Sequence, residues 1–150
     1  MSEAASKLQI HASCVELAGT GVLLLGDSGS GKSDLALRLI DAGARLVSDD
    51  RTDLVAEGGR LFASSPATIA GRMEVRGLGI VSVAHVSYSV VGLAIELVPR
   101  TSVERLPVAR SKSWLGVEVP LLAFDPFEAS APAKVRLAVQ ETLRGRLFAA

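Results

Sequence analysis

The residues with the clearest chemical potential in this chain form a glycine-rich segment over positions 26–33. The segment reads Gly26-Asp27-Ser28-Gly29-Ser30-Gly31-Lys32-Ser33 and fits the pattern G-x-x-x-x-G-K-[ST] at every fixed position. Its glycines let successive backbone N–H groups turn inward, where they can bind an anion. Lys32 can reach the β- and γ-phosphates of a nucleotide, and the Ser33 hydroxyl can bind Mg²⁺. These eight residues are therefore the candidate nucleotide-binding residues.

The flanking residues predict the elements that would position this loop. Residues 22–25 read Val-Leu-Leu-Leu, an apolar run typical of a buried strand. Residues 33–42 follow with apolar side chains at helical spacing, and Gly43 is a stop signal. The order strand, loop and helix suits phosphate binding, because the positive end of the helix dipole then faces the anion. The alternative interpretation is a glycine-rich turn that binds nothing.

Two adjacent carboxylates, Asp49 and Asp50, end the next predicted strand, which covers residues 45–48. Nucleotide sites in α/β sheets lie at the carboxyl ends of strands, where a carboxylate can hold Mg²⁺ directly or through water. Neighbouring side chains point to opposite sides of a strand, so we expect the two aspartates to act differently. One can serve the metal, and the other can take a proton from an incoming hydroxyl. The alternative is a solvated turn, where Asp is common.

Three further polar residues have no clear role when judged from the residues alone. His11 resembles a half-buried strand residue. Glu74 lies in a glycine-containing segment over residues 73–79, which suggests a functional loop, although a surface turn is the simpler interpretation. Arg105, like Lys112, fits an ordinary surface position.

The rest of the sequence contains both hairpin signals and helical patterns, which predicts an α/β fold. We expect the nucleotide-binding sheet of this fold not to be purely parallel. Glycines 58 and 59 indicate a hairpin, and Pro120 within an apolar run indicates a strand near an edge. The expected elements are a strand or strand pair over 8–17, a hairpin over 52–56 and 60–63, a helical turn over 66–70, a central strand over 87–98, a strand over 114–124 and a helix over 132–148.

Composition narrows the class of protein. The 150 residues suit one domain over 1–150, and 49% hydrophobic residues with 4% aromatics predict an aliphatic core. Sixteen basic residues balance sixteen acidic ones, which argues against nucleic acid as a partner. Cys14 is alone, so we expect a buried thiol in a reducing compartment. With no signal-peptide run and no membrane-spanning apolar run, the expected location is the cytoplasm.

Three blocks in this order resemble the bacterial HPr kinase/phosphorylase family. They are the loop over 26–33, the segment AGARLVSDD over 42–50 and the segment EVRGLGI over 74–80, which is similar to the family's signature. The resemblance covers residues 8–140. It implies an enzyme that uses ATP and Mg²⁺ to phosphorylate a serine of the phosphocarrier protein HPr. It also implies a catalytic domain similar to the nucleotide-binding core of phosphoenolpyruvate carboxykinase, and a homo-oligomer, which in the family is a hexamer.

The resemblance assigns roles to individual residues. Asp50 matches the carboxylate that acts as base in phosphorylation and as acid in the reverse reaction, and Lys32 matches the loop lysine. Ser33 and Glu74 match the Mg²⁺ ligands, and Asp49 is a third candidate ligand. By the same resemblance His11 and Arg105 match active-site residues. The eight loop residues form the implied ATP site.

Two departures from the family pattern affect the expected activity. By this resemblance we expect the chain to begin at the catalytic domain, without the family's additional N-terminal domain, as in short forms of α-proteobacteria. Its HPr-like partner could then belong to a nitrogen-related phosphotransferase system. Many members also remove the phosphate with inorganic phosphate, which yields pyrophosphate. The segment over 126–132 lies where the family has a loop tied to this reaction, but it lacks the expected arginines and glycines. We therefore expect a weak reverse reaction.

Other functions remain compatible with a phosphate-binding loop. A small-molecule kinase would need an arginine-rich lid, and no such segment occurs. A non-catalytic nucleotide-binding regulator would be favoured by loss of Lys32 or Asp50, but both residues are present. A GTPase is disfavoured because the chain has no Asn-Lys-x-Asp motif for guanine.

Overall fold

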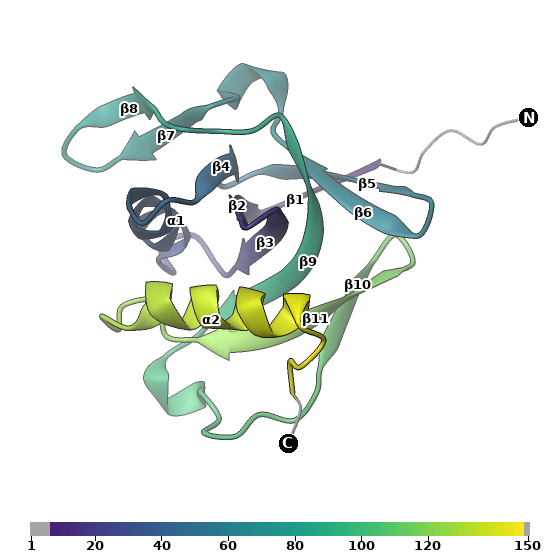
Figure 1. The fold of residues 1–150 in the computed structure, drawn as a ribbon. Coiled ribbons are helices and arrows are strands. Elements are labelled where there is room, and N and C mark those ends of the chain that lie inside the picture. Colours follow the sequence, from purple (N-terminus) through teal and green to yellow (C-terminus); the bar gives the residue numbers. More distant parts are fainter. Residues whose placement is uncertain (1–6, 149–150) are drawn as a thin grey trace, which may run out of the picture.

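The computed structural model describes residues 7–148 (Figure 1). Two α-helices are present in this part of the chain, α1 (Lys32–Asp41) and α2 (Ala131–Leu143), with short 3₁₀ turns at Ala67–Ile69 and Arg100–Ser102. The strands are β1 (Lys7–Ile10), β2 (Ala12–Leu17), β3 (Thr20–Leu25), β4 (Arg45–Ser48), β5 (Thr52–Glu57), β6 (Arg60–Ser64), β7 (Arg72–Val75), β8 (Gly79–Ser82), β9 (Tyr88–Leu97), β10 (Ser111–Trp114) and β11 (Val117–Phe124).

Most strands join one curled, mixed sheet. Its main order is β1-β5-β6-β9-β3-β2-β4, and β11 joins it beside β9 while also pairing with β10. The pairs β3–β9 and β9–β11 are parallel, whereas the other pairs in this sheet are antiparallel. The ten residues of β9 pair with β6 near their start and with β3 and β11 further along. The predictions of a mixed α/β sheet and of a central strand over 87–98 are therefore confirmed.

The centre of the sheet is buried on both faces. Val22 and Leu24 of β3 pack into the cluster under α1 and α2, whereas Leu23 packs into the cluster on the other face. A strand covered on both sides needs apolar residues at every position, which explains the unbroken run before the glycine-rich loop. Among the described residues, Trp114 is the only aromatic side chain in the buried core. Cys14 is fully buried, and this desolvation raises the pKa of its thiol.

Two predicted elements were wrong in extent. The single strand expected over 114–124 is a hairpin, because Leu115 and Gly116 adopt positive φ values of 51° and 81° and reverse the chain. Within β11, the residues up to Pro120 pair with β10, and the residues from Leu121 pair with β9. Pro120 thus lies where the strand changes partner, a position that needs no ladder N–H.

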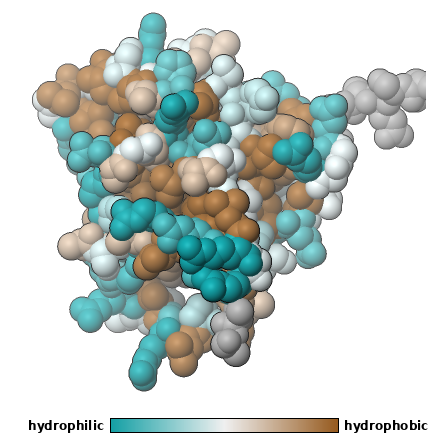
Figure 2. Space-filling model, in the orientation of Figure 1, coloured by the Kyte–Doolittle hydropathy of each residue, from teal (hydrophilic) through white to brown (hydrophobic). Residues whose placement is uncertain are grey.

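The helix expected over 132–148 ends at Leu143. Gly145 follows with a φ of 67°, and its N–H donates to the Thr142 carbonyl at 3.0 Å, so the chain leaves the helix through a left-handed residue. Figure 2 shows hydrophilic residues along the outer face of α2. Neither α-helix of the described residues is long and apolar enough to cross a membrane.

Residues 73–79, for which a functional loop or a surface turn was expected, belong to a separate two-stranded hairpin, β7–β8, with a turn at residues 76–78. Its inner side chains, Met73 and Val75, pack against the core under α1. Its tip carries two apolar side chains, Leu78 and Ile80, which are largely exposed. The hairpin brings the Glu74 segment beside α1, which is why this segment contributes to the site described next.

Candidate active site

The glycine-rich loop joins β3, a buried central strand, to α1 as the pattern predicted. Gly29 and Gly31 have φ values of 82° and 102°, a backbone conformation that residues with a Cβ rarely adopt. Gly31 is the N-cap of α1, and no side chain caps this helix end. The first helical bond runs from the Leu35 N–H to the Gly31 carbonyl. The N–H groups of the first turn are therefore available to an anion.

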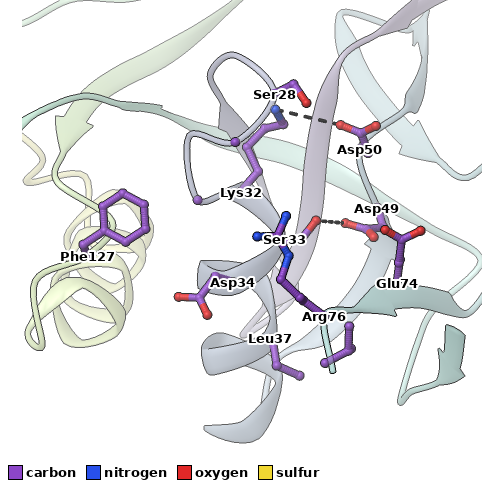
Figure 3. A pocket seen from close by; sticks show the side chains of 13 residues that line it. Ser28, Lys32, Ser33, Asp34, Leu37, Asp49, Asp50, Glu74, Arg76 and Phe127 are labelled. Atoms are coloured by element: carbon purple, nitrogen blue, oxygen red, sulfur yellow. Dashed lines mark hydrogen bonds and ion pairs between the residues drawn. The ribbon is translucent and has the colours of Figure 1, made fainter. Parts of the chain in front are cut away.

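Lys32 is folded back over the loop. Its ammonium group donates hydrogen bonds to the carbonyl oxygens of Gly26 at 2.7 Å and Asp27 at 3.0 Å, and only 5% of the residue is exposed. The same Nζ lies 3.9 Å from Oδ1 of Asp50 (Figure 3). A buried charge needs such partners because desolvation is costly. The loop and the end of β4 thus place a cation and a carboxylate side by side.

Asp49 and Asp50 diverge as predicted. Asp49 is buried, and its Oδ1 accepts hydrogen bonds from the hydroxyls of Ser33 at 2.7 Å and Ser13 at 3.2 Å. The Asp50 side chain is 61% exposed and faces Lys32, while its backbone N–H donates to the Ser13 hydroxyl at 3.0 Å. Asp50 has a φ of 63°, a left-handed conformation in which Asp and Asn are enriched. The Asp49 carboxylate therefore faces two serine hydroxyls, whereas the Asp50 carboxylate faces the Lys32 ammonium group.

These groups line a cavity of about 610 Å³ that has two walls (Figure 3). The loop wall has three parts. They are residues 28, 29 and 31–34 of the loop and the start of α1 together with Leu37, the aspartates Asp49 and Asp50 after β4, and residues 74–76 of the β7–β8 hairpin. The Phe127 wall consists of residues 125–128, of which Phe127 lines the cavity. Figure 3 shows Phe127 on the opposite side of the loop from Asp49, Asp50 and Glu74. The cavity thus has a polar, charged end and an aromatic end.

The hairpin supplies Glu74 and Arg76 to the loop wall. Met73 and Val75 point into the core, and side chains alternate along a strand, so Glu74 and Arg76 share the other side. Both residues are exposed and line the cavity. Sequence reasoning missed Arg76, although its spacing of two from Glu74 was a usable signal. It also missed Ser13 and Phe127, for which no local signal existed.

The oxygen donors of this end suit a hard divalent cation. The Ser33 hydroxyl, the Asp49 carboxylate and the Glu74 carboxylate all line the cavity. The described residues nevertheless contain no group of three or more His, Cys, Asp or Glu side chains able to hold a metal ion unaided. Mg²⁺ commonly binds through one or two carboxylates together with substrate phosphates, so this sparse set fits a metal that arrives with a nucleotide.

Some predicted site residues lie outside the cavity lining. His11 is exposed in the bend between β1 and β2, one residue before Ala12, which pairs with Leu25 at the start of the loop. Arg105 is exposed in the connection between β9 and β10. Within the loop, Gly26, Asp27 and Ser30 do not line the cavity. The Ser30 hydroxyl is instead buried, with no hydrogen-bond partner within residues 7–148.

Comparison with known proteins gives consistent matches. The family model described as HPr serine kinase C-terminal domain matches residues 2–124. HPr kinase/phosphorylase of Clostridium tetani is 47% identical over 79 residues, which cover 53% of this chain and 26% of the relative. HPr kinase/phosphorylase of Prosthecochloris aestuarii is 37% identical over 126 residues, which cover 76% of this chain and 37% of the relative. The matched part of the chain thus spans 26% and 37% of the length of these two relatives.

A solved structure of a related protein shares most of this architecture. The structure of the Hpr(Ser) kinase/phosphatase from Coxiella burnetii has a TM-score of 0.82 and 31% sequence identity to this chain. The match covers 92% of this chain and 97% of that one. The curled mixed sheet with its two helices is therefore an arrangement already seen in that protein.

Proposed function

Because the chain belongs to the family of the HPr serine kinase C-terminal domain, we propose that it transfers the γ-phosphoryl group of ATP to a serine of an HPr-like phosphocarrier protein. Residues 1–150 would act as one catalytic domain. The observation that carries this proposal is the juxtaposition of the Lys32 ammonium group and the exposed Asp50 carboxylate, 3.9 Å apart at the open end of a glycine-rich loop. The similarity to the core of phosphoenolpyruvate carboxykinase stays a prediction.

The loop wall would hold the phosphates of ATP. Free N–H groups at the start of α1 and the Lys32 ammonium group offer positive partners to the phosphate oxygens. Lys32 would exchange its present acceptors, the carbonyls of Gly26 and Asp27, for phosphate. Ser33, Asp49 and Glu74 would hold Mg²⁺, which when bound compensates the charge of the transferred phosphoryl group. Ser13 keeps Asp49 oriented through its own hydrogen bond.

Asp50 is the proposed base. Its side chain is mostly exposed, so a serine on the surface of another protein can approach it from solvent. The carboxylate would accept the hydroxyl proton as the oxygen attacks phosphorus, and it would return a proton in the reverse reaction. An exposed base also favours a protein acceptor over a small molecule, which would need an enclosed pocket. The left-handed backbone of Asp50, braced by the Ser13 hydroxyl, fixes the direction of this side chain.

The roles of His11 and Arg105 rest on the family resemblance alone. Both side chains are exposed and lie outside the cavity lining, so we propose that they contact the docked phosphocarrier protein or the phosphate it brings. Assembly into a homo-oligomer, a hexamer as in the family, is proposed on the same basis.

The test is phosphoryl transfer from radiolabelled ATP to the HPr-like proteins of the same organism in the presence of Mg²⁺. We expect label on the acceptor serine, and none when that serine is replaced by alanine. Absence of transfer to every HPr-like protein would contradict the proposal, and an acceptor among small metabolites would replace it with a small-molecule kinase.

The reverse reaction is expected to be slower than the forward one. It requires inorganic phosphate beside a phosphoserine, and two clustered anions need nearby cations. The segment over 126–132 contains no Lys or Arg, and the Lys134 ammonium group beside it is bound to Glu128 at 2.7 Å. The loop wall supplies two cations, Lys32, which the phosphates of ATP would engage, and Arg76. Incubation of the phosphorylated partner with millimolar phosphate, followed by assay of pyrophosphate, measures this rate; equal forward and reverse rates would contradict the expectation.

A further inference from the structure

The far end of the cavity carries an aromatic side chain that the proposed phosphoryl transfer does not use. Phe127 is 68% exposed and is the one aromatic residue that lines the cavity. Only 4% of the chain is aromatic, and an exposed phenyl ring forgoes the stability that burial would contribute. Because the ring also lines the cavity, it is available to a ligand that binds there.

The backbone around this ring is anchored to the glycine-rich loop and to α1. Pro126 and Phe127 pack so closely on Gly31 that a Cβ there would lie 3.0 Å from Cγ of Pro126 and 3.1 Å from Cζ of Phe127. The Arg38 guanidinium group donates to the carbonyl of Pro126 and, at 3.4 Å, to that of Glu128. The Phe127 N–H donates to Oδ1 of Asp125 at 2.9 Å. The ring is thus preorganised although its surface is largely uncovered.

The position of the ring matches the end of a nucleotide that lies away from the reacting phosphate. Lys32 and Asp50 mark the γ-phosphate end, and the N-terminus of α1 takes the phosphates that precede it. The nucleoside must then extend away from Asp50. Figure 3 shows Phe127 on that opposite side of the loop. The tip of its ring is close to Gly31, where a Cβ would lie 3.1 Å from Cζ.

We propose that Phe127 is the stacking platform for the nucleobase of the bound nucleotide, an inference that rests on the proposed function above. A phenyl face attracts the flat face of any base, and such stacking is sequence-tolerant. The ring therefore contributes affinity for a nucleoside triphosphate over a bare phosphate chain, and it accepts either purine. The anchored backbone on both sides limits the conformational entropy lost when the base binds.

The test compares two probes, Mg·ATP and inorganic tripolyphosphate with Mg²⁺, by calorimetry on the whole chain. Phe127→Ala should weaken ATP binding about fivefold to 140-fold, the range of base–aromatic stacking, and should leave tripolyphosphate binding within about twofold. Phe127→Trp should retain ATP affinity and gain a fluorescence change when ATP binds. Leu106→Ala is the matched control, because Leu106 is 82% exposed and does not line the cavity.

The outcomes separate this inference from the proposed function. Equal loss of both probes in Phe127→Ala would mean that the ring only shapes the loop, and it would overturn the inference. Unchanged ATP binding with a raised KM for the phosphocarrier protein would overturn it too, since the ring would then belong to a docking surface. In both cases the wild type still binds ATP and transfers phosphate. Failure of the wild type to bind Mg·ATP at all would instead overturn the proposed function, and this inference with it.

Discussion

The loop wall and the Phe127 wall face each other across one cavity, but they are held in different ways. Lys32 in the loop wall is held by carbonyls five and six residues away in sequence. The Phe127 wall is held by the Arg38 side chain, whose two acceptors in that wall lie 88 and 90 residues away in sequence. The first wall therefore depends largely on local chain geometry, whereas the second exists only once α1, β11 and α2 have packed together.

This difference suggests a division of labour. The glycine-rich loop of this wall continues from β3, a buried central strand, so Lys32 has a rigid base. The Phe127 wall lies on a connection between β11 and α2, and its contacts involve side chains that are partly exposed. Chemistry should therefore depend on the loop wall, and nucleotide affinity and local stability on the contacts between the two walls.

The largest expected effect comes from removing Lys32, the buried cation of the loop wall. Lys32→Ala should abolish phosphoryl transfer, because no other loop side chain can neutralise the β- and γ-phosphates. The fold should survive, as judged by circular dichroism, since Lys32 belongs to neither apolar core cluster. Lys112→Ala on β10 is the control and should be fully active. Retention of more than about a tenth of the activity, a loss below ~1.4 kcal/mol, would contradict the assignment.

The next effect separates the two aspartates of the loop wall. Asp50→Asn should slow transfer by about 10²–10⁴-fold, the contribution of a general base, and keep Mg·ATP affinity within a few-fold. Asn tolerates the left-handed backbone at this position, so the local conformation should be retained. Asp49→Asn should instead weaken Mg·ATP binding, because Asp49 is the proposed metal ligand. A collapse of ATP affinity in Asp50→Asn, measured by calorimetry, would exchange these two roles.

A pair of glycine substitutions tests the contact between the walls. Gly29 and Gly31 both have positive φ, so alanine strains either backbone by about 1–2 kcal/mol. Only at Gly31 does the new Cβ also collide with Pro126 and Phe127; nothing lies within 4 Å at Gly29. Gly31→Ala should therefore lower the free energy of unfolding by about 1 kcal/mol more than Gly29→Ala, as measured in urea. Equal losses would show that the walls do not press on each other.

The smallest effect concerns an ion pair behind the Phe127 wall. The hydrogen bond from Lys134 lowers the pKa of the Glu128 carboxyl from its ordinary value of 4.5. A lowered folded-state pKa stabilises the fold above pH 4.5, and this contribution is lost as the pH falls through the lowered value. The Tm difference between wild type and Lys134→Met should therefore shrink on acidification below pH 4.5. A difference that grows over this range would contradict the pairing.

Several features followed from the sequence alone because local chemistry determines them. A run of apolar residues, a loop with glycines at fixed positions and a helical repeat specify β3, the glycine-rich loop and α1 almost residue by residue. Glycines 58 and 59, with φ values of 60° and 75°, likewise specified the hairpin of β5 and β6. The aspartates after β4 were found for the same reason, since strand ends beside such a loop collect functional carboxylates.

Where local signals compete or are absent, tertiary structure decided the outcome. The apolar run over 114–124 concealed a turn at Leu115, a residue with no intrinsic preference for positive φ. The bond from Ser13 to Asp49 and the contact of Phe127 with Gly31 join segments far apart in the chain. Such pairs arise from sheet register and helix packing, which a single sequence does not encode in any one stretch. The residue types thus determined what chemistry was available, and the fold determined which groups meet.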